Sequence, residues 1–120
     1  MEDYRLGAME TRFAELIWQH APVASGELVK LCQAAFGWKK STTYTMLRRL
    51  CERGLFQNEG GTVSALMTPE AVSAVQSEAF VDETFGGSLP KFVAAFASRK
   101  KLSDKEIAAL QALIDENRGA

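Results

Sequence analysis

The sequence predicts a mainly α-helical protein, with a winged helix-turn-helix domain over residues 1–68 and a helical module over residues 69–120. Three observations lead to this fold. Apolar residues recur at the spacing of amphipathic helices in three segments before residue 54. Two short runs then flank Gly60-Gly61, which is typical of a β-hairpin. From residue 68 onward the pattern is helical only.

Composition limits the classes of protein to which the chain can belong. Of its 120 residues, 47% are hydrophobic and 24% are charged, as is usual for a globular chain. No apolar run approaches the roughly 20 residues that span a bilayer, and residues 1–5 do not resemble a signal peptide. We therefore expect a cytoplasmic protein with no membrane insertion. Cys32 and Cys51 have neither a zinc-binding nor a redox spacing, so both are interpreted as reduced core thiols.

Three helices are expected in the first domain. The first ends near Ala21-Pro22 and is predicted by four apolar residues at helical spacing: Met9, Phe13, Leu16 and Ile17. The second follows Ser25, its expected N-cap, and stops at Gly37. Its expected inward residues are Leu28, Leu31, Cys32 and Ala35. The third runs from Ser41 to Arg53, and residues 37–40 supply the turn that a helix-turn-helix pair requires.

A β-hairpin and three further helices are expected after residue 54. Residues 55–58 and 62–66 are predicted to be antiparallel strands joined by a tight turn. Thr68 is the expected N-cap of a helix that begins at Pro69 and breaks at Gly86-Gly87. Ser88 is expected to cap the next helix, and Ser103 opens the last one with a capping box.

The third helix carries most of the functional information. One side of it holds the expected core contacts, Thr43, Met46, Leu47 and Leu50. The other side collects Ser41, Thr45, Arg48 and Glu52, flanked by Thr42, Tyr44 and Arg49. Small hydroxyl side chains permit close approach to a DNA groove, and arginine binds guanine or phosphate. We therefore predict a DNA-binding set of Lys39, Lys40, Ser41, Thr42, Tyr44, Thr45, Arg48 and Arg49.

Charge is consistent with DNA binding but does not require it. Residues 39–53 hold five cations, opposed within that window by Glu52, whereas the whole chain has a net charge of −1 and a pI near 5.8. A solvated helix face would explain the same window. The main alternative function is a winged-helix module that docks an acidic protein through this face, without direct DNA readout.

Residues 38–55 resemble the recognition-helix signature of the BlaI/MecI/CopY family of penicillinase repressors. The shared pattern comprises Trp38, the stretch Thr42-Thr43-Tyr44-Thr45, the pair Arg49-Leu50 and the close Arg53-Gly54-Leu55. The resemblance implies a dimeric bacterial transcriptional repressor that binds an inverted-repeat operator of the TACA/TGTA kind. It also raises the possibility of regulation by a membrane protease sensor, as in the resistance branch of the family.

Three departures from the family's pattern limit what the resemblance implies. Residues 60–66 lack the basic and aromatic residues usual in the family's wing, so a strong wing–phosphate contact is not expected. Ala95-Phe96 stands where the resistance repressors are cut at an Asn-Phe bond, so the sequence does not support a protease partner. The cysteine cluster of the copper branch is missing, so copper sensing is not expected.

Residues 69–120 are expected to form a homodimer. Chains this short bury only about 60% of their unfolded surface, and a second copy would cover the remaining apolar face. The predicted dimerisation residues are Val72, Val75, Phe80, Phe92, Val93, Phe96, Leu110, Leu113 and Ile114. No catalytic site, cofactor or metal is expected, because His20 is the only histidine and neither glycine pair precedes a phosphate-loop Lys.

Overall fold

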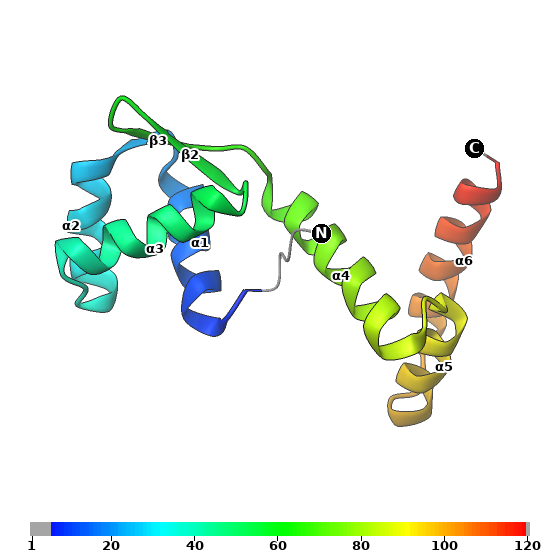
Figure 1. The fold of residues 1–120 in the computed structure, drawn as a ribbon. Helices are drawn as coiled ribbons and strands as arrows, with labels where there is room; N and C mark the ends of the chain where they lie inside the picture. Colours follow the sequence, from blue (N-terminus) through cyan, green and yellow to red (C-terminus); the bar gives the residue numbers. More distant parts are fainter. Residues whose placement is uncertain (1–5, 120) are drawn as a thin grey trace. The chain divides into compact units, whose positions relative to one another are not determined.

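The computed structural model describes residues 6–119, in which six helices accompany a small antiparallel sheet (Figure 1). The chain divides into two compact units, the first ending at Glu78 and the second beginning at Ala79. The elements are α1 (Ala8–His20), β1 (Val23–Ala24), α2 (Ser25–Phe36), α3 (Lys40–Glu52), β2 (Phe56–Glu59), β3 (Thr62–Ala65), α4 (Pro69–Phe85), α5 (Leu89–Arg99) and α6 (Asp104–Arg118). The predicted mainly α-helical winged helix-turn-helix fold is confirmed.

The helix-turn-helix pair is α2 and α3, joined by a short turn that begins at Gly37. Gly37 has φ of 69°, a left-handed conformation that ends α2, and its N–H donates to the carbonyl of Gln33 across 2.9 Å. Trp38 then packs its ring against Phe13 and Phe36, with centroids 5.2 and 4.8 Å apart. This aromatic contact holds the start of α3 against α1 and α2.

The sheet contains one strand that the sequence did not predict. Its strand order is β1-β3-β2, and the two residues of β1 pair with β3 through Val23 opposite Val63 and Ala24 opposite Thr62. The hairpin β2–β3 was predicted to within one residue at each end. Gly60 and Gly61 have φ of 58° and 84°, which suits a two-residue hairpin turn. The N-terminus of α2 is thus tied directly to the wing.

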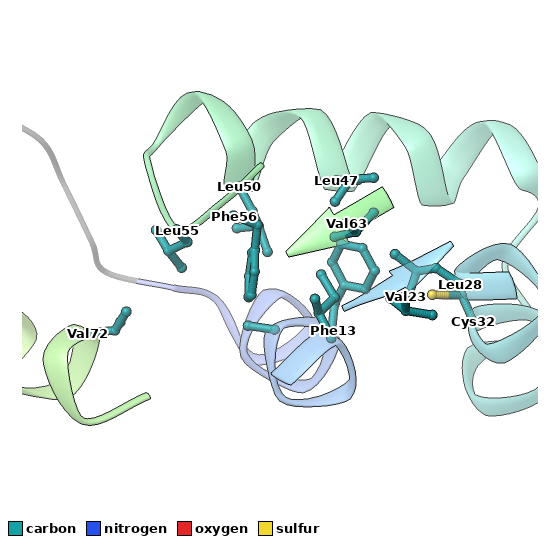
Figure 2. Packing of buried hydrophobic residues seen from close by; sticks show 12 residues of the cluster. Phe13, Val23, Leu28, Cys32, Leu47, Leu50, Leu55, Phe56, Val63 and Val72 are labelled. Carbon is teal, nitrogen blue, oxygen red and sulfur yellow. The ribbon is translucent and has the colours of Figure 1, made fainter. Parts of the chain in front are cut away.

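The core of the first unit lies between α3, the sheet and α1. Figure 2 shows Leu47 and Leu50 projecting from α3 toward Phe13, Phe56 and Val63. These side chains are at most 2% exposed, so α3 is anchored along its whole inner side. Val72, on α4, is 3% exposed and belongs to the same core. The first compact unit therefore continues past Thr68, where the sequence placed the domain boundary, to Glu78.

Three sequence expectations about the first two helices were wrong. Met9 was expected on the inner stripe of α1 but is 39% exposed, and Ala14 is buried instead. Ala35 was expected to point inward but is exposed, and the next residue, Phe36, packs against the core instead. Ser25 is the first residue of α2 rather than its N-cap; Ala24 takes the cap position while also pairing with β3.

The caps predicted for α4, α5 and α6 are confirmed. The N–H of Ala71 donates to Thr68 Oγ1 across 3.0 Å, and the N–H of Lys91 donates to Ser88 Oγ across 3.2 Å. Ser103 and Glu106 form the reciprocal capping box of α6. Three phenylalanines, Phe80, Phe85 and Phe92, cluster in the second unit with centroids 5.5–5.9 Å apart. None of the described helices combines the length and apolarity needed to cross a bilayer.

Candidate nucleic-acid interface

Hydroxyl and cationic side chains make up most of the exposed outer side of α3, which ends at the exposed carboxylate of Glu52. Lys39 is the N-cap residue of α3 and Lys40 its first residue, and both are exposed. The exposed side chains that follow along the helix are Ser41, Thr42, Thr45, Arg48 and Arg49. We call these seven residues the α3 surface. Of these, Ser41, Thr45 and Arg48 lie on the side that helical periodicity assigned to the outside. Thr42 and Arg49 flank that side, and Lys39 and Lys40 were expected in the preceding turn.

The inner side of α3 fixes how this surface is presented. Thr43 is 1% exposed, and its hydroxyl donates to the carbonyl of Lys39 across 3.3 Å, which satisfies the buried oxygen. Leu47 and Leu50 are buried in the core, and Met46 is half-buried against it. The four predicted core contacts of α3 are confirmed. Because Thr43 near one end and Leu50 near the other are both buried, α3 is fixed about its own axis with the α3 surface facing outward.

Positive charge gathers at the N-terminal end of α3. The first turn of a helix has unpaired N–H groups and a partial positive charge, which favours phosphate. Lys39 and Lys40 add two full charges at this end, and no acidic residue lies in the first turn of α3. Arg48 and Arg49 follow two turns later. The distribution suits a polyanion approaching the N-terminal half of α3.

Arg53, the fifth cation of the window, faces a carboxylate in the structure. Its Nη1 lies 2.9 Å from Oε2 of Glu10, on α1, and both side chains are about three-quarters buried. The sequence did not reveal this pair, because the two residues are 43 positions apart. The positive charge of the window is therefore concentrated in Lys39, Lys40, Arg48 and Arg49.

Tyr44 differs from its neighbours on α3. It is half-buried, and its hydroxyl donates a hydrogen bond to Ser25 Oγ across 3.1 Å. The backbone N–H of Ser25 in turn donates to the carbonyl of Gly61, in the turn of the wing, across 2.8 Å. Sequence reasoning placed Tyr44 in the DNA-binding set and did not find Ser25. The only available signal was a polar residue at the start of α2, which was interpreted as a cap.

A shallow groove runs between α3 and the wing. It has a volume of about 310 Å³ and is lined by Tyr44, Leu47, Arg48, Cys51 and Asn58. Asn58 and Glu59, on the wing side, are exposed. Residues 56–65 contain no Lys or Arg, and Glu59 is their one charged residue. The lining of the groove thus combines one cation, Arg48 on α3, with the amide of Asn58 on the wing side.

Both cysteines are held as neutral thiols. Cys32 is fully buried, and burial raises the pKa of its thiol, an effect partly offset by a hydrogen bond with Thr43. Cys51 is half-buried, and its pKa is raised by burial and by the negative charge of Glu52. Among the described residues, no group of three His, Cys, Asp or Glu side chains is placed to hold a metal ion.

The second unit exposes an apolar face on α5 and α6. Among the predicted dimerisation residues, Phe80, Phe96, Leu113 and Ile114 are 46–54% exposed, and Leu110 is 36% exposed. Phe92 and Val93 are half-buried, and so is Val75, which lies on α4 within the first unit. A groove of about 390 Å³ lies between the two helices, lined by Phe92, Val93, Phe96, Leu102, Glu106, Ala109 and Leu110. Val72 is not part of this surface, because it is buried in the core of the first unit.

The matches to known proteins include a family model, a protein sequence and a solved structure. A family model described as penicillinase repressor matches residues 6–116. The penicillinase repressor of Bacillus licheniformis is 26% identical over 113 residues, which cover 91% of this chain and 88% of that protein. The solution structure of the Bacillus licheniformis BlaI monomeric form in complex with the blaP half-operator is similar over 59% of this chain and 93% of that chain. For that structure the sequence identity is 22% and the TM-score is 0.49.

Proposed function

The chain belongs to the penicillinase repressor family, and from that premise we propose that it is a transcriptional repressor that binds double-stranded DNA through α3. One observation carries the proposal. Apart from Glu52 at its C-terminal end, the exposed residues of α3 are small hydroxyl residues and cations, and they lie on a helix anchored along its inner side. A helix of this kind fits the major groove, whose width admits an α-helix.

The proposed roles follow from side-chain chemistry and position along α3. Lys39 and Lys40, at the N-terminus, contact phosphates, with the helix dipole adding to their attraction. Ser41, Thr42 and Thr45 are short enough for the helix to approach the base edges, where a threonine methyl can meet a thymine methyl.

The two arginines lie farther along the helix and have long side chains. Arg48 and Arg49 are both exposed on α3. Arg48 also lines the groove beside the wing. Each guanidinium can donate two hydrogen bonds to guanine or bind a phosphate oxygen. We propose that these side chains supply the sequence discrimination that the short hydroxyl residues alone cannot provide.

We further propose that the repressor acts as a homodimer on an inverted-repeat operator. Support comes from the second unit, where Phe96, Leu113 and Ile114 expose about half of their surface on two adjacent helices. A second copy related by a two-fold axis would cover this face and present two α3 helices to one duplex. Half-sites would then lie about one helical turn apart. A protein with this role is expected in the cytoplasm.

The position that matches the family's cleavage site is helical in this chain. Ala95 and Phe96 lie inside α5, where the backbone is held in a helix that spans Leu89–Arg99. A protease needs an extended backbone, so cleavage there would require α5 to unfold locally. No inducing signal is assigned.

Two steps test the proposed function: selection of duplexes from a random-sequence pool by the purified chain, and titration of the chain against the enriched duplex. We expect one short duplex to be enriched, and we expect the affinity of the chain for it to fall steeply with salt. If a dimer places about eight cations on phosphates, the slope of log affinity against log salt should be near −7. A chain that enriches no duplex, and instead binds an acidic protein partner, would support the alternative of a protein-interaction module.

A further inference from the structure

Tyr44 lies on the flank of the outer side of α3, and its hydroxyl is hydrogen-bonded to another part of the protein. The hydroxyl donates to Ser25 Oγ across 3.1 Å in a partly buried position. A tyrosine that contacts DNA through its hydroxyl would direct that group to a phosphate or a base. Here the hydroxyl is hydrogen-bonded to the first residue of α2.

Ser25 also holds the turn of the wing. Its backbone N–H donates to the carbonyl of Gly61 across 2.8 Å, and a Cβ placed on Gly61 would lie 3.9 Å from Ser25 Oγ. Figure 1 shows the turn of the hairpin next to the first turn of α2. Gly61, Ser25 and Tyr44 therefore form a chain of contacts from the wing turn to the recognition helix.

The ring of Tyr44 extends this chain to the groove. It lines the groove between α3 and the wing, together with Arg48 on α3 and Asn58 on β2. Tyr44 thus contacts the start of α2 through its hydroxyl and borders the groove beside Arg48 through its ring. None of the seven residues of the α3 surface has a described hydrogen bond to the start of α2, so among these side chains this link is made by Tyr44, beside that surface.

We infer that Tyr44 and Ser25 are positioning residues of the interface: their hydrogen bond sets α3 relative to the wing turn before DNA binds. This inference rests on the proposed function. A preformed arrangement binds more tightly because less conformational freedom is lost on association. The gain is limited to what one hydrogen bond contributes, which corresponds to a change of about two- to tenfold in affinity.

Three variants of the full chain test the inference: Tyr44→Phe, which removes only the hydroxyl, Ser25→Ala, which removes the acceptor, and the double variant. The probe is the duplex that the wild-type chain enriches from a random-sequence pool, compared with a scrambled duplex of equal length. We expect both single variants to lose affinity for the enriched duplex by the same two- to tenfold factor. The double variant should be no weaker than either single variant.

Two further readouts separate positioning from general destabilisation. Affinity for the scrambled duplex should change less than affinity for the enriched one, and the salt slope should stay constant because no cation is removed. Ser25→Thr keeps a hydroxyl at the same position and should restore wild-type affinity. Ser77→Ala removes an exposed hydroxyl on α4 that donates to its own helix and should change nothing.

The possible outcomes distinguish this inference from the proposed function. Weakening by Tyr44→Phe but not by Ser25→Ala would show that the tyrosine hydroxyl contacts DNA directly, and would overturn the inference. Additive losses in the double variant, or no loss in either single variant, would also overturn it. If the wild-type chain enriches no duplex, the proposed function fails and the inference fails with it.

Discussion

The guanidinium of Arg53 donates a hydrogen bond to Oε2 of Glu10 across 2.9 Å, and this contact joins the end of α3 to the first turn of α1. The other carboxylate oxygen of Glu10 accepts from the N–H of Gly7 across 3.2 Å, at the N-cap of α1. One carboxylate thus caps α1 and holds the C-terminal end of α3. At the other end of α3, Lys39 is the N-cap residue and Lys40 the first helical residue.

Replacing Glu10 should therefore destabilise the first unit. Glu10→Gln removes the charge opposite Arg53 but keeps a carbonyl that can accept from Gly7. We expect the free energy of unfolding to fall by about 1 kcal/mol, because the pair is charge-assisted but retains some exposure to solvent. Denaturant unfolding measures this change.

A matched control lies on the same helix. Glu15 is exposed on α1, so Glu15→Gln should change the free energy of unfolding by less than about 0.5 kcal/mol. A double variant carrying Glu10→Gln and Arg53→Gln should lose less than the sum of the two single losses. Equal losses at positions 10 and 15 would contradict the stabilising role of the pair.

The α3 surface should contribute to DNA affinity and little to stability. Arg48→Ala and Thr45→Ala both shorten exposed side chains. Each should weaken binding to the enriched duplex by about 1–3 kcal/mol if it removes a base contact. The thermal midpoint should stay within about 4 °C of the wild-type value, since exposed substitutions have small effects on stability.

A cation away from the proposed interface serves as the control. Lys30 is exposed on α2, and Lys30→Ala should leave the affinity for the enriched duplex unchanged. If Arg48 binds a phosphate, its removal should weaken binding to all sequences alike and make the salt slope shallower by about 1. Unchanged affinity in both Arg48→Ala and Thr45→Ala would show that another face of the protein binds DNA.

Sequence reasoning succeeded where a local pattern determines the structure. The side of α3 occupied by Leu47 and Leu50 follows from helical periodicity, and the caps at Thr68, Ser88 and Ser103 follow from short local motifs. These features need only residues within one or two turns of each other.

Features that depend on contacts between distant residues were not predicted from the sequence. The strand Val23–Ala24 is too short to show a period and exists only because β3 lies beside it. That pairing also placed Ala24, not Ser25, at the cap of α2. The bonds of Tyr44 to Ser25 and of Arg53 to Glu10 join residues 19 and 43 positions apart, which no local pattern specifies.

The two thiols should react at very different rates in the native protein. Cys32 is fully buried and Cys51 is half-buried, and the pKa of each thiol is raised above its ordinary value of 9.0. A disulfide reagent at pH 8 should therefore modify Cys51 slowly, and Cys32 only after unfolding, because the thiolate is the reactive form. Labelling of Cys51→Ser, with and without denaturant, measures the rate at Cys32. Rapid modification of Cys32 in the folded state would contradict its burial.

Raised thiol pKa values also predict how stability depends on pH. Below the unfolded pKa of about 9 both states hold neutral thiols, so these groups add no pH dependence. As the pH rises above 9, the unfolded chain ionises first and binds fewer protons than the folded chain, so the free energy of unfolding falls. The fall should be smaller in Cys32→Ala, measured by denaturant unfolding between pH 8 and pH 10. An equal fall in both proteins would assign it to other groups.

The apolar face of the second unit should make the chain dimeric. We expect the full chain to sediment as a dimer at micromolar concentration. Phe96→Asp or Leu113→Asp places a charge on side chains that are 46% and 54% exposed, and each should give a monomer. Lys105→Asp places the same charge at an exposed polar position on α6 and should leave the dimer intact. A full-length chain that sediments as a monomer would contradict the proposal.

Dimerisation should in turn determine DNA affinity, because linked half-site contacts raise the effective concentration of the second α3 helix. Leu113→Asp keeps the α3 surface unchanged, so the monomer should bind a single half-site as the wild-type chain does but lose the extra affinity for an inverted repeat. A truncated chain provides the same comparison only if it ends at Glu78, since Val72 belongs to the core of the first unit and ending at Leu66 would remove it. Loss of Val72 would destabilise that core by roughly 1–3 kcal/mol. A lower DNA affinity of such a chain would then reflect incomplete folding as well as the loss of dimerisation. If the Leu113→Asp monomer binds the inverted repeat as tightly as the wild-type chain, each α3 helix binds independently and the two-fold arrangement is wrong.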